Sequence, residues 1–219
     1  MLKAAWLGTV PYGEALALQE ALVARRQRDA GEDTLLLLEH PPVITLGRGA
    51  DRSHVRRTPA ALREMKVDLF ETGRGGDVTY HAPGQLVGYP ILLLPEPFRD
   101  LHLLMRRVEE ILIAVAGDFG VEAGRIHGLT GVWVGHEKLA AIGMRVSQWV
   151  TSHGFALNVS TDLAGFDLIV PCGLPDRGVT SLSRLLGREI RVEEVVPAAM
   201  RHCARVFGMR LVEDDRARL

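Results

Sequence analysis

The most informative stretch of the chain is Arg74-Gly75-Gly76-Asp77-Val78-Thr79-Tyr80-His81-Ala82-Pro83-Gly84-Gln85. It places three glycines, a proline, an arginine, a tyrosine and a histidine in twelve positions. Because glycine has no Cβ, a ligand can approach the backbone amides of such a segment closely. The stretch contains neither the phosphate loop that ends in Gly-Lys-Ser/Thr nor the dinucleotide-binding glycine pattern. Taken alone, it predicts either a loop that wraps a substrate or a wide turn before a strand.

A second stretch, Gly131-Val132-Trp133-Val134-Gly135-His136-Glu137-Lys138-Leu139-Ala140-Ala141-Ile142-Gly143, follows about fifty residues later. The sequence Gly135-His136-Glu137 fits a hairpin connection, after which Lys138 begins an apolar strand. A lysine in that place is usually a solvated charge at a sheet edge. If it instead turns into an apolar pocket, desolvation lowers the pKa of its amine.

The third stretch is Ile169-Val170-Pro171-Cys172-Gly173-Leu174-Pro175. A cysteine between proline and glycine belongs to a sharp, irregular turn, where it is either a nucleophile or an ordinary loop thiol. The other cysteine, Cys203, falls on the apolar face of a helical pattern and is expected to be inert core.

Histidines give no clear metal signal. His81 and His153 both adjoin glycine-rich turns, and a site built from Cys172, His81 and His153 is conceivable. However, the chain has no closely spaced ligand pattern such as Cys-x-x-Cys or His-Glu-x-x-His. We therefore expect no metal.

Composition limits the remaining possibilities. The 219 residues include 26 Lys and Arg against 27 Asp and Glu, a net charge of −1, which disfavours a nucleic-acid binder that relies on bulk charge. No run approaches the roughly 20 apolar residues of a membrane-spanning helix, and the first residues do not resemble a signal peptide. We expect a cytoplasmic protein, with one domain over residues 1–219 and enough chain to bury a core.

Apolar periodicity predicts a mixture of strands and helices. Strands are expected at 34–39, 43–46, 85–94, 131–134, 138–146 and 154–159. Helices are expected around Ala15 to Leu22 and over 58–65, 99–118, 180–186 and 195–207. Since the two types do not alternate strictly, we predict an α+β (mixed α/β) domain with a mixed central sheet flanked by helices.

Together, the three stretches and His153-Gly154-Phe155-Ala156-Leu157-Asn158 resemble the lipoyl(octanoyl) transferase family, over about residues 35–182. The matching pieces are Arg74-Gly75-Gly76-x-x-Thr79-Tyr80-His81-x-Pro83-Gly84-Gln85, Lys138–Gly143 with Arg145, and Pro171-Cys172-Gly173. Ala82 departs from the glycine that is usual in the family, and we expect it to be tolerated if φ stays negative there.

The resemblance implies the catalytic-domain fold of biotin and lipoate protein ligases, and a reaction without cofactor or metal. An octanoyl group passes from octanoyl-acyl-carrier protein to Cys172, with Lys138 as its partner. It then passes to a lysine of lipoyl domains, in 2-oxoacid dehydrogenase complexes and the glycine-cleavage H protein. The residues implied in substrate binding are Arg74, Gly75, Gly76, Asp77, Val78, Thr79, Tyr80, His81, Ala141, Ile142, Gly143, Gly154, Phe155 and Ala156.

Further expectations concern partners. Arg48, Arg52, Arg56 and Arg57 are either a docking patch for the acidic carrier protein or a solvated loop. We expect a monomer that binds neither nucleic acid nor membrane. The alternatives are an ATP-dependent lipoate protein ligase, a cysteine hydrolase with His81 or His153 as base, and an acyl-binding protein without catalysis.

Overall fold

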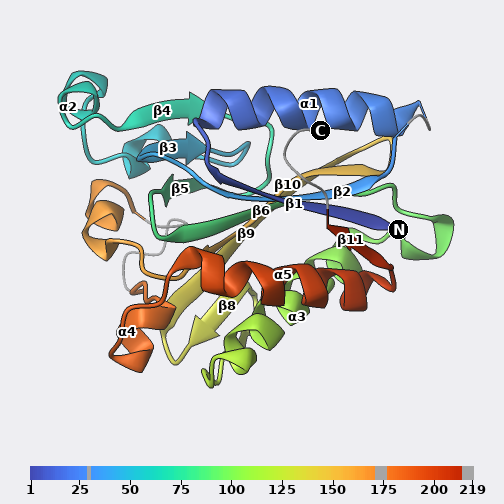
Figure 1. Ribbon diagram of the computed structural model, residues 1–219. Helices are drawn as coiled ribbons and strands as arrows, with labels where there is room; N and C mark the ends of the chain where they lie inside the picture. Colours follow the sequence, from blue (N-terminus) through green and yellow to red (C-terminus); the bar gives the residue numbers. More distant parts are fainter. Residues whose placement is uncertain (29–30, 171–176, 214–219) are drawn as a thin grey trace.

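A large mixed β-sheet forms the centre of the molecule in a computed structural model that describes residues 1–28, 31–170 and 177–213 (Figure 1). In the described part of the chain, the strands of this sheet, in spatial order, are β11 (Leu211–Glu213), β1 (Leu2–Thr9), β2 (Asp33–Glu39), β6 (Gln85–Ile91), β10 (Val150–Asn158), β9 (Glu137–Ser147), β8 (Leu129–Val134) and β7 (Gly124–Ile126). Strands β1, β2 and β11 run parallel to one another, and the remaining neighbours pair antiparallel.

A smaller sheet lies beside it and contributes the segment that carries the first motif. Its order is β4 (Asp68–Glu71), β3 (Val43–Leu46) and β5 (Val78–His81). The turn at residues 82–84 leads directly from β5 into β6, so the chain crosses from the small sheet to the large one at the motif.

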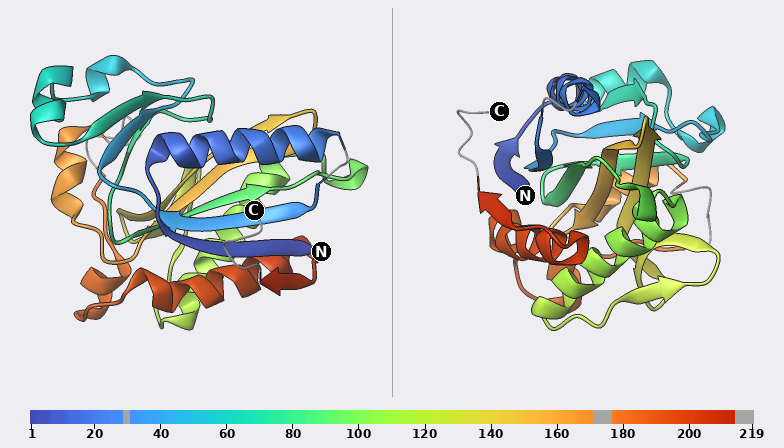
Figure 2. Two further views of the ribbon diagram at one scale, coloured as in Figure 1. Left: turned by 45° about the horizontal axis from the view of Figure 1, so that its top comes forward. Right: turned by 90° about the vertical axis from the view of Figure 1, so that its right-hand side faces the viewer.

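Helices cover both faces of the large sheet (Figure 2). Helix α1 (Tyr12–Gln27) lies on one face, and α3 (Leu101–Asp118) and α5 (Val192–Phe207) lie on the other. Two short helices, α2 (Pro59–Glu64) and α4 (Leu182–Leu186), and the 3₁₀ turns η1 (Arg52–His54), η2 (Glu96–Phe98) and η3 (Leu163–Leu168) complete the described elements.

Strand β2 shows why the sequence produces this layering. Leu36 and Leu38 pack under α1, whereas Leu35 and Leu37 belong to the cluster under α3 and α5. A strand buried on both faces is apolar at every position instead of alternating. The run of four leucines therefore occupies the interior of the sheet.

Most predicted elements are confirmed to within a few residues, including the Thr58 cap of α2, whose hydroxyl accepts a hydrogen bond from the backbone N–H of Ala61. Sequence analysis did not predict β1, β4, β5, β7 or β11. Four of these have three or four residues, too few to show a period, and β1 is interrupted by Gly8 in the left-handed region (φ 66°). Ala82 is not among the residues with positive φ, as its tolerance requires.

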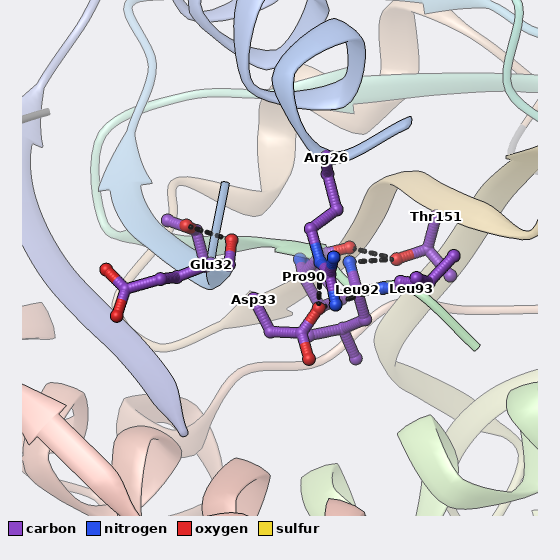
Figure 3. Close-up of polar contacts among 8 residues, drawn as sticks. Arg26, Glu32, Asp33, Pro90, Leu92, Leu93 and Thr151 are labelled. Carbon is purple, nitrogen blue, oxygen red and sulfur yellow. Dashed lines mark hydrogen bonds and ion pairs between the residues drawn. The ribbon is translucent and has the colours of Figure 1, made fainter. Parts of the chain in front are cut away.

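Asp33 joins helix α1 to strands β2 and β6 (Figure 3). Its Oδ1 accepts hydrogen bonds from Arg26 Nε and from the backbone N–H of Leu93, both at 2.9 Å. Nearby, the Thr151 hydroxyl accepts from Leu92 N–H and donates to the Pro90 carbonyl. The Arg26 and Asp33 side chains are only 14% and 12% exposed, so this is a largely buried ion pair.

We predict that Asp33→Ala lowers the free energy of unfolding by about 2–4 kcal/mol, because a buried guanidinium and a backbone N–H lose their acceptor. Glu32→Ala is the matched control: its pair with Lys3 is 44% exposed on the glutamate side, and its loss should cost about 1 kcal/mol or less. Urea denaturation followed by circular dichroism measures both. Equal losses in the two variants would show that Asp33 is not the anchor described here.

No helix among the described residues is long and apolar enough to cross a membrane.

Candidate functional site

A narrow slot lies where the small sheet meets the large one. It encloses about 510 Å³, including its open mouth. Five elements and the loop before β5 supply its walls. The lining residues are Tyr12 of α1; Arg74, Gly76 and Asp77 of the loop; Val78, Thr79 and His81 of β5; Val87 and Tyr89 of β6; Ala141, Ile142 and Gly143 of β9; and His153, Gly154, Phe155 and Ala156 of β10.

The slot brings together the three segments implied in substrate binding, which are distant in sequence. All of the residues implied in substrate binding line it except Gly75 and Tyr80. Gly75 instead donates its N–H to the Met144 carbonyl at 2.9 Å, which ties the loop to β9. Tyr80 points to the other side of β5, where its ring meets Phe166 edge-on at 5.6 Å between centroids.

Glycines in the slot allow backbones to approach closely. Gly143 and Gly154 are directly paired across β9 and β10. A Cβ on Gly143 would lie 3.0 Å from the Gly75 carbonyl oxygen and 3.1 Å from Arg74 Cδ. The motif glycines therefore make the slot by letting the loop pack directly on the sheet.

Lys138 is buried beside this slot, only 8% exposed, and is not a solvated edge charge. Its Nζ lies 4.7 Å from the centroid of the Trp133 ring. It lines a small adjoining cavity, which shares Thr79, Ala141 and Ala156 with the slot. An amine is thus placed next to one end of a mostly apolar channel.

Cys172 lies outside the described residues, but the chain on either side of its segment is well held. On one side, Val170 donates its N–H to the His54 carbonyl at 2.8 Å. On the other, Lys138 N–H donates to the Gly178 carbonyl at 2.9 Å, and Thr180 N–H donates to the Lys138 carbonyl at 3.0 Å. Residues 178–180, which follow this segment in the chain, therefore pair with the backbone of Lys138.

A chain of buried side-chain hydrogen bonds connects the motif to that same place. His81 Nδ1 donates to Gln85 Oε1 at 2.7 Å, and Gln85 Nε2 donates to Asn158 Oδ1 at 2.9 Å. Asn158 Nδ2 in turn donates to the Thr180 carbonyl at 3.0 Å. The chain links β5, β6 and β10 to the strand-like segment that pairs with Lys138, so it fixes these walls relative to one another.

Away from Lys138, the slot is lined by polar groups. Arg74 is 8% exposed and donates to Thr45 O at 2.6 Å and to Thr45 Oγ1. His40, behind the slot, binds the Val10 carbonyl through Nδ1 and the Tyr89 hydroxyl through Nε2, both at 2.7 Å. Since a carbonyl only accepts, Nδ1 carries the proton and the Tyr89 hydroxyl donates to Nε2.

The histidine and tyrosine side chains around Arg74 are held uncharged. Burial lowers the pKa of His40 to about 4 and that of His81 to about 3, and for His81 the neighbouring His40 and Arg74 add to the effect. Burial also raises the pKa of Tyr12 to about 12. At neutral pH, Arg74 is therefore a cation among neutral histidine and tyrosine side chains.

Several residues of the site were not predicted from the sequence. Tyr12, Val87 and Tyr89 line the slot but lie in an ordinary helix and an ordinary strand, with no local signal. His153 lines the slot too, and it lies within β10, not in a turn.

Among the described residues, no group of three or more His, Cys, Asp and Glu side chains is placed to hold a metal ion. Cys203 is buried in the core as predicted, and burial raises the pKa of its thiol to about 12.

Comparison with known proteins gives consistent results. Residues 11–204 match the family of lipoyl protein ligase A/B catalytic domains. An octanoyltransferase of Caldicellulosiruptor bescii is 52% identical over 208 residues, which cover 94% of this chain and 91% of that protein. An octanoyltransferase of Solibacter usitatus is 52% identical over 206 residues, covering 94% and 93%.

Solved structures share the fold at much lower identity. Lipoate-protein ligase A bound with ATP superposes with a TM-score of 0.75 at 17% identity, covering 99% of this chain and 90% of that one. The biotin protein ligase from Aquifex aeolicus in complex with biotin and ATP gives 0.55 at 16% identity, covering 94% and 70%. The predicted mixed α/β fold of the biotin and lipoate ligases is confirmed.

The neutral histidines predict a pH dependence of stability. The pKa of His81 is about 3 in the folded state and near 6.5 when unfolded, so the unfolded state binds the additional proton between these values. The contribution of His81 to the free energy of unfolding is therefore complete above pH 6.5, and it is lost as the pH falls through the acidic range. We predict that His81→Gln flattens this loss, by up to about 1.4 kcal/mol per pH unit.

Urea denaturation of both proteins at intervals from pH 7.5 to 4.5 measures the slope, which is independent of any constant stability cost of the substitution. Parallel profiles in the two proteins would contradict a buried neutral His81.

Proposed function

The chain belongs to the lipoyl protein ligase A/B catalytic-domain family and is an octanoyltransferase, and we propose that it works through a thioester on Cys172 with Lys138 as proton carrier. In the first step, the Cys172 sulfur bonds to the octanoyl carbonyl carbon and the bond from that carbon to the donor sulfur breaks. The cysteine proton passes to Lys138 and from there to the departing thiolate.

In the second step, the ε-amine of an acceptor lysine attacks the same carbonyl. An amide bond forms, the bond to Cys172 breaks, and Lys138 carries the released amine proton back to the cysteine sulfur. In each step the proton released by the attacking group ends on the departing sulfur, so neither step leaves a net charge behind.

The single observation that supports this best is the position of Lys138. A free thiol has a pKa near 8.5, so only a few per cent is thiolate at neutral pH. An adjacent amine increases the reactive fraction, either by accepting the proton or, as ammonium, by stabilising the thiolate. Lys138 is buried next to the slot, and its backbone binds the segment that follows Cys172.

In this proposal the slot holds the octanoyl chain, with its thioester end toward Lys138. At about 0.8 kcal/mol per buried CH₂ group, an enclosed seven-carbon tail contributes several kcal/mol of binding. We assign the contacts with the octanoyl chain to those residues implied by the resemblance that also line the slot. Gly75 and Tyr80 then act indirectly, by fixing the loop on β9 and by packing β5 against Phe166.

We further propose octanoyl-acyl-carrier protein as donor and lipoyl domains, including those of 2-oxoacid dehydrogenase complexes and the glycine-cleavage H protein, as acceptors. The proposal includes a monomer that acts in the cytoplasm and uses no cofactor. A catalytic thiol and amine suffice for transfer from a thioester to an amine, since the donor thioester is already activated and the acyl group stays activated until the amide forms.

We predict that the alkylation rate of Cys172 by iodoacetamide, measured against pH, changes shape in Lys138→Ala. Without the amine, the thiol titrates nearer 8.5 and its rate at neutral pH falls about tenfold or more. Peptide mass spectrometry separates Cys172 from buried Cys203, which serves as an internal control. An unchanged profile would reject the pair.

The surface near Lys138 suggests how an acidic donor docks. Arg48, Arg52, Arg56 and Arg57 are all exposed, and Arg52 also forms an ion pair with Glu71. Arg56 also lines an open hollow together with Arg177 and Arg184. Glu137 and Asp167 line the hollow too, and Arg184 pairs with Glu137 at 3.6 Å. The hollow shares Phe166 and Val179 with the cavity of Lys138, so the three arginines lie beside an approach to the amine.

We predict that the double variant Arg56→Glu, Arg57→Glu raises KM for octanoyl-acyl-carrier protein severalfold at low salt and leaves kcat unchanged, because long-range attraction is reversed. The effect should shrink in high salt and be absent with a small octanoyl thioester.

The double variant Arg25→Glu, Arg28→Glu, at exposed positions of the C-terminal end of α1, carries the same change of charge and is the matched control. An equal rise in KM for the control, or for the small thioester, would refute docking at Arg56 and Arg57.

A further inference from the structure

A second hollow lies behind the slot, and one residue lines both of them. This rear hollow has about 840 Å³ of space, including its open side, and lies between α1 and the distal ends of β9 and β10. Of the residues that the structure describes, only His153 lines both it and the slot. The rear hollow is also lined by Gln19, Val23 and Ala24 of α1 and by Arg145 of β9.

The backbone holds His153 in this place in an unusual conformation. Its φ is 53°, in the left-handed region that residues other than glycine adopt in only a few per cent of cases, with asparagine, aspartate and histidine the more frequent exceptions. Its N–H donates to Oε1 of the buried Gln19 at 2.8 Å instead of continuing a regular strand pattern. Such strain persists only where the surroundings impose it, and it is concentrated at functional positions.

The ring itself is held less firmly than the other two buried histidines. His40 and His81 have hydrogen-bonded ring nitrogens, whereas His153 Nδ1 is buried with no partner among the described residues. Gln19 Nε2, beside it, is likewise buried and unsatisfied. Burial and the nearby Arg74 and Arg145 lower the pKa of His153 to about 4, so the residue that lines both the slot and the rear hollow is uncharged at neutral pH.

The position of His153 along β9 and β10 matches the far end of a bound octanoyl chain. Lys138 stands at the start of β9, while His153 pairs with Met144, six positions further on. Six strand residues span roughly 20 Å. The seven carbon–carbon bonds of an extended octanoyl chain cover roughly 9 Å, and the lysine side chain and the thioester group occupy much of the rest.

We propose that the His153 ring is the end stop of the acyl slot and sets the upper limit on the length of the acyl chain that is transferred. Beyond it, α1 lines the rear hollow with Leu16, Val23 and Ala24 as well as with Gln19, Glu20 and Gln27, and the distal carbons of a longer chain can pack on the three apolar side chains. This inference rests on the proposed placement of the chain in the slot.

The test compares transfer of octanoyl and dodecanoyl groups from their acyl-carrier-protein thioesters to a lipoyl domain. We expect His153→Gly to raise the ratio of kcat/KM for dodecanoyl over octanoyl at least tenfold. His153→Asn, which tolerates the same φ with a smaller side chain, should raise it by less and provides a second variant if the glycine protein does not fold.

Two further variants separate length control from general effects. Lys66→Gly relaxes a positive φ of 58° at an exposed position whose chain neighbours line neither cavity, and it should leave the ratio unchanged. Adding Ala24→Trp to His153→Gly fills the rear hollow and should return the ratio toward the wild-type value.

An unchanged ratio in folded His153 variants that still transfer octanoyl would overturn the end stop and leave the transferase proposal intact. If the wild-type protein transfers octanoyl to no lipoyl domain, the proposed function itself fails.

Discussion

The hydrogen bond from Gln85 Nε2 to Asn158 Oδ1, at 2.9 Å, is the contact on which the geometry of the site depends. Both side chains are almost fully buried, and each uses its other amide atom to hold a further element. Through them, the small sheet, the large sheet and the segment beside Lys138 keep a fixed relation. Because unsatisfied buried amides are costly, removing either partner would disturb all three at once. The first sequence motif ends on Gln85 and the fourth on Asn158, so two matching motifs meet in this one bond.

The sequence predicted elements wherever a long period or a strong terminator is present. The leucines of β2, the prolines after it and the apolar face of α3 all identified their elements. Short strands such as β5 could not be recognised, because four residues do not establish alternation and glycines surround them. The motifs located most of the slot, since glycine and polar residues in apolar surroundings are informative. Tyr12 and Tyr89 were missed because only tertiary packing turns them toward the slot. For Lys138 the local sequence favoured the wrong environment, a solvated position at a sheet edge. Its burial follows from the pairing of residues 178–180 with β9, which the local sequence does not reveal.

The slot combines apolar walls with buried polar groups that remain uncharged. His40 and His81 are neutral because burial opposes protonation, and Arg74 adds to this effect on His81 while its own donors are held by Thr45. A bound chain of methylene groups would therefore lie among neutral histidine and tyrosine side chains in the described part of the slot, beside the buried cation of Arg74. The same fold in lipoate-protein ligase A is seen with ATP bound. The present chain belongs with octanoyltransferases, and its distinguishing chemistry is expected where a cysteine follows Pro171. A shared fold thus accommodates different ways of activating an acyl group.

The covalent intermediate is the central claim, and the intact mass of the enzyme tests it most directly. After brief exposure to octanoyl-acyl-carrier protein without acceptor, the wild-type protein should gain one octanoyl group, mapped to Cys172. Addition of a lipoyl domain should remove that group from the enzyme and place it on the acceptor lysine. Cys172→Ala should gain nothing and transfer nothing. Transfer at the wild-type rate by Cys172→Ala, without any adduct on the enzyme, would contradict the account.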